Sequence, residues 1–173
     1  MTYKELKESK NLEDINYFDL LKCEEWKVKR AEILNRDNFE CRKCGSTRTQ
    51  YTQTVNNEIH YYHEIKGQPI KSNEFVSLQV HHELYIYNKL PWLYLNRYLI
   101  TLCSVCHHKF HNDNSVEVWD EHKLNKMEVG PCDRCSGKGY IKEYRKIQGG
   151  ICFKCRGYGY NRRLINLTEL DDD

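Results

Sequence analysis

The stretch LITLCSVCHHKFH, residues 99–111, decides the fold of this chain. It begins as a β-favouring run and continues into a segment in which a C-x-x-C pair is followed directly by histidines. If the second half is helical, His107 and His111 share a face, because residues four apart on a helix are neighbours. Cys106 then points about 100° away from His107, since a helix has 3.6 residues per turn. The sulfur and imidazole groups of this stretch are therefore predicted to face different places.

The cysteines elsewhere in the chain also follow a regular spacing. The chain has 9 cysteines: Cys23 stands alone and the others form C-x-x-C pairs, a spacing that lets two thiolates reach one tetrahedral ion. The N-terminal residues MTYKELKESKNLED contain no apolar signal segment, and no run approaches the roughly 20 apolar residues that span a bilayer. We therefore expect a cytoplasmic, bacterial or phage-encoded protein with no membrane partner, whose reduced thiols bind zinc. The pairs are Cys41/Cys44, Cys103/Cys106, Cys132/Cys135 and Cys152/Cys155.

Two partitions of the metal ligands compete around residues 99–111. In one, Cys103, Cys106, His107 and His111 form a single closed zinc finger. In the other, Cys103 and Cys106 join Cys41 and Cys44 in a four-cysteine zinc site, and the histidines serve a different metal. We favour the second partition, because Cys41 and Cys44 would otherwise lack partners and because the helical geometry separates the sulfurs from the imidazoles.

The C-terminal part contains an internal repeat. CDRCSGKGY (132–140) recurs as CFKCRGYGY (152–160), and the 16 residues between Cys135 and Cys152 fall within the spacing of paired zinc knuckles. We predict a second structural zinc ion held by Cys132, Cys135, Cys152 and Cys155. With 39% hydrophobic residues the core is thin, and a structural zinc ion contributes on the order of 10 kcal/mol of apparent folding free energy.

A family resemblance rests on VHH (80–82), on LITLCSVCHHKFH (99–111) and on the upstream RDNFECRKCG (36–45). Together these motifs resemble the zinc-stapled HNH endonucleases, whose α+β fold is the ββα-metal type. The resemblance implies hydrolysis of DNA phosphodiester bonds to 5′-phosphate and 3′-hydroxyl ends. It implies His81 as a ligand of one catalytic divalent ion, His82 as the general base, and His107 and His111 as further ligands. Tyr98 stands where many members have an asparagine.

The expected cofactors are two structural Zn²⁺ ions and one catalytic divalent ion, Mg²⁺ or Mn²⁺, with Zn²⁺ or Ni²⁺ as alternatives. Asn88 or Asn96 would take over the loop-bracing role of the missing asparagine. Trp26, Arg30, Ile33 and Leu34 fall on one helical face, which predicts a helix from Glu24 to about Arg36. The expected segments are an N-terminal arm (1–21), a nuclease domain (22–114) with an irregular or hairpin insertion at about 47–76, a linker (115–131), a zinc-ribbon-like four-cysteine module (132–163) and an acidic tail (164–173).

Basic residues gather beside the cysteine pairs, although the net charge is only +2. Between residues 134 and 163, Glu143 is the single acidic residue beside nine lysines and arginines. This clustering is typical of polyanion binders, so DNA is the expected partner, with a protein partner or a homodimer left open. The predicted DNA contacts are Arg42, Lys43, Arg134, Lys138, Arg145, Lys154, Arg156, Arg162 and Arg163.

Two other functions are compatible with the same residues. The first is a non-catalytic, double-zinc nucleic-acid-binding or adaptor protein in which the histidines are structural. The second follows the C-terminal repeat, which resembles the cysteine-rich zinc module of DnaJ-type co-chaperones, toward binding of client proteins. This chain has two of the repeats of that module and no J-domain signature.

Overall fold

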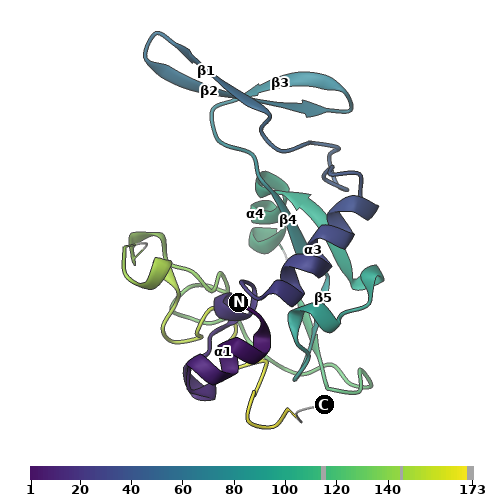
Figure 1. The fold of residues 1–173 in the computed structure, drawn as a ribbon, viewed down its shortest axis with the longest axis vertical. Coiled ribbons are helices and arrows are strands. Elements are labelled where there is room, and N and C mark those ends of the chain that lie inside the picture. The colour runs from purple at the N-terminus through teal and green to yellow at the C-terminus, as the bar shows by residue number, and fades with distance from the viewer. Residues whose placement is uncertain (114–115, 145, 171–173) are drawn as a thin grey trace. The chain divides into compact units, whose positions relative to one another are not determined.

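The computed structural model describes residues 1–113, 116–144 and 146–170 of the chain. It is a small mixed α+β protein made of short elements (Figure 1). Among the described residues, no helix has the length and apolar character needed to cross a membrane. The helices are α1 (Tyr3–Ser9), α2 (Tyr17–Leu20), α3 (Glu24–Arg36) and α4 (Ser104–Asp113), with short 3-10 turns between them. The strands are β1 (Tyr51–Val55), β2 (Glu58–Ile65), β3 (Gln68–Ser72), β4 (Leu78–His82), β5 (Leu84–Ile86), β6 (Leu99–Cys103) and β7 (Glu117–Trp119).

Two compact units divide the chain, and each is assembled from segments that are distant in sequence. The histidine unit comprises Arg30–Glu83 and Leu95–Asn114. The terminal unit comprises Met1–Lys29, Leu84–Tyr94 and Ser115–Asp173.

In the histidine unit, β4 and β6 form an antiparallel pair. Strand β6 is followed directly by helix α4 (Figure 1). The register places His81 opposite Ile100 and His82 opposite Leu99. Residues directly opposite in an antiparallel pair share a face, and successive residues alternate. His81 and Ile100 therefore face one side of the pair, while His82 and Leu99 face the other.

Helix α3 has the bounds predicted from its pattern of apolar residues. Trp26, Ile33 and Leu34, which fall on one predicted helical face, are all buried. At the end of this helix, the Arg36 guanidinium donates to the carbonyl oxygen of Leu99 at 2.8 Å. The chain that leaves α3 is thereby attached to β6.

The predicted insertion is a three-stranded antiparallel sheet in the order β1-β2-β3. Its strands span residues 51–72, whereas the sequence predicted an irregular segment or a hairpin. Two left-handed residues form each turn, Asn56 and Asn57 in the first and Lys66 and Gly67 in the second. Paired positive φ values match the right-handed twist of hairpin strands, so each two-residue loop closes a tight hairpin.

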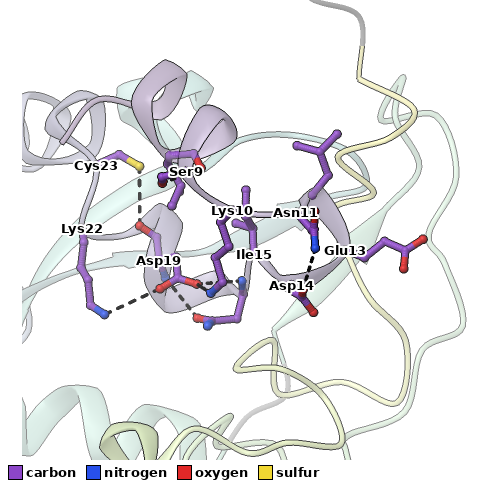
Figure 2. A network of polar contacts seen from close by, with 12 residues as sticks. Ser9, Lys10, Asn11, Glu13, Asp14, Ile15, Asp19, Lys22 and Cys23 are labelled. Atoms are coloured by element: carbon purple, nitrogen blue, oxygen red, sulfur yellow. Dashed lines mark hydrogen bonds and ion pairs between the residues drawn. The ribbon is translucent and has the colours of Figure 1, made fainter.

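The terminal unit joins the beginning and the end of the chain. The Arg163 guanidinium donates to the carbonyl oxygens of Leu12 at 3.1 Å and Ile15 at 2.9 Å. The backbone N–H of Tyr17 donates to the carbonyl oxygen of Arg156 at 3.2 Å. Nearby, Asp19 accepts from the Lys10 ammonium at 2.7 Å and lies within 3.7 Å of the Lys22 ammonium (Figure 2).

The observed units therefore cut the chain differently from the predicted segments. Residues 1–21, predicted as an arm, belong to the same compact unit as the predicted module 132–163. The predicted linker 115–131 contains β7, which pairs in parallel with β5. The physical reason is that long-range hydrogen bonds, such as those of Arg163, hold segments together that no local pattern connects. Residues 114, 115 and 171–173 lie outside the described residues, so the linker boundary and the end of the acidic tail stay predictions.

Candidate metal centres

The first cysteine centre lies in the histidine unit. Its four sulfurs, which all lie within 4.8 Å of one another, belong to Cys41, Cys44, Cys103 and Cys106. This grouping agrees with the second of the two ligand partitions, the one favoured from the sequence. Cys41 and Cys44 occupy the turn after α3, where Gly45 adopts a φ of 74° and donates its N–H to the Cys41 carbonyl oxygen at 2.7 Å. Cys103 ends β6 and Cys106 lies in the first turn of α4. The four sulfurs fit a tetrahedral structural zinc ion.

Hydrogen bonding favours the thiolate form of one ligand of this centre, Cys41. The Cys103 side chain and the backbone amides of Lys43 and Cys44 lower the pKa of the Cys41 thiol to about 4, against the opposing effect of burial. The thiolate is the form of cysteine that binds zinc. Cys106 also donates its backbone N–H to the Cys103 sulfur at 3.4 Å. The centre therefore resembles a zinc knuckle whose amides already point at the sulfurs.

The second cysteine centre is built by the C-terminal repeat. The sulfurs of Cys132, Cys135, Cys152 and Cys155 lie within 4.8 Å of one another, and all four residues are buried. A second structural zinc ion fits this group as predicted from the spacing.

Glycines of the repeat hold the two knuckles together. The Gly139 N–H donates to the Cys135 sulfur at 3.2 Å, and the Gly159 N–H donates to the Cys155 sulfur at 3.3 Å. In exchange, the Cys132 N–H donates to the Gly159 carbonyl oxygen, and the Cys152 N–H donates to the Gly139 carbonyl oxygen. The two halves of the repeat are thus joined by reciprocal backbone hydrogen bonds from a cysteine of one half to a glycine of the other.

A third centre consists of histidines. Ring nitrogens of His81, His107 and His111 lie within 4.8 Å of one another, and the ring centroids are 4.6 to 5.1 Å apart. His81 comes from β4, whereas His107 and His111 lie four residues apart on one face of α4. The structure thus brings together the three predicted ligands of the catalytic ion, and the cysteine group of the same unit contains none of them.

The electrostatics of the histidine centre fit a cation-binding role. Burial, with a further contribution from His107 and His111, lowers the pKa of His81 to about 2. Burial and the neighbouring His111 lower the pKa of His107 to about 4. Each imidazole is therefore neutral near pH 7 and keeps a lone pair for a ligand. The Nε2 atom of His81 is buried and has no hydrogen-bond partner among the described residues. A divalent ion would satisfy this atom, and imidazole suits ions such as Zn²⁺ or Ni²⁺.

Two further residues complete the surroundings of the histidines. The Phe110 ring lies edge-on to His81 with centroids 4.6 Å apart, and it forms an apolar wall that sequence reasoning missed. Its position three residues after His107, on the same helical face, was the available signal. His82 lies outside the triad, on the opposite side of β4, and its side chain is 3% exposed.

The loop before β6 is braced by one of the two predicted asparagines. Asn96 donates its side-chain amide to Glu32 at 2.6 Å, and its carbonyl oxygen accepts from Arg36 at 2.5 Å. Asn88 lies in the terminal unit, where its side-chain oxygen accepts from the Asn166 N–H at 2.8 Å. The bracing role in the histidine unit therefore falls to Asn96.

The predicted DNA contacts fall in different surroundings. Lys154 forms an ion pair with Asp133 at 2.7 Å, and Arg42 lies 3.9 Å from Asp37. Arg162 lies over the Tyr87 ring, and Arg163 is engaged with backbone carbonyls. These contacts give Arg163 a structural role within its unit. The remaining described residues of the set, which are exposed or half-buried, are Lys43, Arg134, Lys138 and Arg156. Arg145 lies outside the described residues.

No protein-family model matches this chain, and neither curated protein sequences nor solved structures show a significant similarity to it.

Proposed function

We propose that this chain is a metal-dependent HNH-type endonuclease that hydrolyses phosphodiester bonds of DNA. The observation that carries the proposal is the convergence of His81, His107 and His111 beside a separate four-cysteine centre. The order of elements, two antiparallel strands followed by a helix, also agrees with a ββα-metal site. The cysteine centre would staple the unit, which leaves the histidines for catalysis.

In this proposal the neutral imidazoles of His81, His107 and His111 hold the catalytic ion. A divalent ion at this position supplies Lewis-acid stabilisation of the negative charge that develops on the phosphate. Phe110 covers one side of His81 and limits the access of water to the ligands. The chain thereby provides a rigid set of ligands from one strand and one helix.

His82 is the proposed general base that takes the proton from the attacking water. Because neighbouring residues on a strand face opposite sides, His82 does not compete with His81 for the ion. Imidazole is the commonest general base in enzymes, and catalytic hydrogen bonds often tighten only when substrate binds. Substrate binding must expose His82, whose side chain is 3% exposed in the free chain.

The test is cleavage of plasmid DNA by the His82→Ala variant in the presence of Mg²⁺ or Mn²⁺. We expect cleavage to fall by about 10²- to 10⁴-fold, the usual contribution of a general base. His108→Ala is the matched control, since His108 is a histidine on α4 that the proposal does not use. Zinc content and circular dichroism should be unchanged in both variants. Equal cleavage by the wild type and His82→Ala would remove His82 from the mechanism.

A second candidate function is favoured by the burial of the strand histidines. His81 and His82 are 2% and 3% exposed, which is the behaviour of structural residues. In this alternative the chain is a non-catalytic, double-zinc nucleic-acid-binding or adaptor protein. It predicts DNA binding without cleavage under any of the candidate metals, and a lower melting temperature for His82→Ala.

A further inference from the structure

The terminal unit exposes aromatic rings around its zinc centre. Phe153 is 43% exposed and Tyr144 is 39% exposed. The Arg134 guanidinium lies 5.9 Å from the centroid of the Tyr144 ring and 6.0 Å from that of Phe153. These distances are within the range of cation–π attraction, so Arg134 holds both rings in place. We call Arg134, Tyr144 and Phe153 the aromatic surface.

The segment 133–154, which contributes the aromatic surface, contains more basic than acidic residues. Lys138, Lys142, Lys146 and Lys154 are all exposed in the described part of the module. Two acidic residues, Asp133 and Glu143, lie among them in the sequence, and Lys154 already pairs with Asp133 at 2.7 Å. Exposed lysines and arginines of this kind attract phosphates and release counterions when a nucleic acid binds.

An open groove adjoins this surface and gives a ligand room. It encloses about 1090 Å³, and Phe153 lines it together with Lys7, Lys10 and Lys22. Its lining residues include four cationic side chains and three carboxylates. One of these carboxylates, Asp19, is already paired with Lys10 and Lys22 (Figure 2). The lining therefore has one more cationic than anionic side chain, and a polyanion meets a slightly positive wall beside Phe153.

We propose that the aromatic surface binds single-stranded DNA by stacking unpaired bases on Phe153 and Tyr144 while the surrounding lysines contact phosphates. Stacking requires a free base face, which a duplex hides, and aromatic platforms in basic surroundings are the usual solution for single strands. The described residues 130–144 and 146–163 contain only 3-10 turns and isolated bridges, so they offer no helix or strand ribbon for a major groove. The choice of DNA over RNA rests on the proposed function.

Binding is tested with the full-length, zinc-loaded protein and without added Mg²⁺ or Mn²⁺. The probes are a fluorescein-labelled oligothymidylate and a labelled duplex of the same length, followed by fluorescence anisotropy. We expect tighter binding of the single strand, and we expect Phe153→Ala to weaken that binding about tenfold. Phe153→Trp should restore it, because tryptophan provides a larger stacking face.

The matched control is Phe75→Ala, because Phe75 is an exposed aromatic residue of the histidine unit, at 58% exposure. This variant should bind the single strand like the wild type, and all variants should keep their zinc.

Equal single-strand affinity of Phe153→Ala and the wild type would overturn the proposal, and so would an equal loss of affinity for the duplex. A loss confined to an acidic peptide probe would assign the surface to a protein partner instead. Plasmid cleavage without Phe153-dependent single-strand binding would refute only this inference, whereas such binding without cleavage would refute only the nuclease.

Discussion

The two adjacent histidines of β4 face opposite sides of the strand. His81 joins His107 and His111, while His82 points away from them. The resemblance to HNH endonucleases implies this division, and the alternation of side chains along a strand and the shared helical face of His107 and His111 agree with it. The burial of both strand histidines was not predictable, since it depends on what packs against each face.

Single glycines are equally decisive in the C-terminal repeat. A Cβ atom at Gly139 would lie 2.3 Å from the carbonyl oxygen of Gly157, which is backbone and cannot move aside. The φ of Gly139 is 67°, and Gly149 has a nearly identical φ of 69° with nothing within 4 Å of its Cβ position. The two positions thus share the strain of a left-handed conformation and differ only in the space available.

We therefore predict that Gly139→Ala weakens the second zinc centre, whereas Gly149→Ala does not. Both substitutions incur about 1 kcal/mol of left-handed backbone strain, and only the first adds a clash that separates the knuckles. The measurement is the rate of zinc release to a colorimetric chelator, together with the melting temperature. Equal rates of zinc release by the two variants would show that the close packing of Gly139 against Gly157 does not stabilise the zinc centre.

At the scale of elements, the end of α3 determines how the histidine unit is assembled. Asp37, which is 4% exposed, accepts the Thr101 N–H of β6 at 3.0 Å and the Arg36 guanidinium at 2.8 Å. The Arg42 N–H donates to the Thr101 carbonyl oxygen at 2.9 Å. Strand β6 is thus clamped between the helix and the first cysteine knuckle. The bounds of α3 were predictable from its periodicity, but this attachment was not.

We predict that Asp37→Asn destabilises the protein by about 2 kcal/mol at neutral pH, the usual contribution of a hydrogen bond to a charged group. Burial acts to raise the pKa of Asp37, but hydrogen bonds from Arg36 and Thr101 outweigh it and leave the pKa lowered. Because the folded-state pKa is lowered, the stabilisation is present above the unfolded-state pKa and is lost as the pH falls through the folded-state value. Urea midpoints of the wild type and the variant should therefore converge below about pH 4.

Asp133→Asn is the control for this prediction, because Asp133 forms an exposed ion pair with Lys154 and such pairs contribute little. Its urea midpoint at neutral pH should match that of the wild type. Exchange of the Thr101 amide proton should become faster in Asp37→Asn alone. A constant difference between the wild type and Asp37→Asn at every pH would contradict the charge-dependent explanation.

For the whole molecule, each compact unit contains its own cysteine centre. The histidine unit holds Cys41, Cys44, Cys103 and Cys106, and the terminal unit holds the other four. Both units are small and polar, and a structural zinc ion contributes a large share of the folding free energy of such domains. Loss of one ion should therefore unfold one unit.

We predict that the wild type holds two zinc ions in its cysteine centres, and that Cys44→Ser and Cys135→Ser each lose one of them. Cys23→Ser is the control, because the Cys23 sulfur lies outside both centres. Its thiol donates to the Asp19 carbonyl oxygen at 3.5 Å. Elemental analysis gives the zinc content, and hydrogen exchange shows which segments lose protection. Loss of both ions in either variant would show that the two centres do not fold independently.

The sequence by itself determined helix α3, strand β6 running into α4, the ligands of both cysteine centres and the shared helical face of His107 and His111. These features follow from spacing and periodicity over a few residues, which local geometry translates directly into position. Only the tertiary structure decided that residues 1–21 share a unit with the C-terminal repeat, that the insertion is a three-stranded sheet, and that His82 is buried. Those outcomes depend on contacts such as Arg163 with Leu12, between residues far apart in the chain, and no local pattern encodes such contacts.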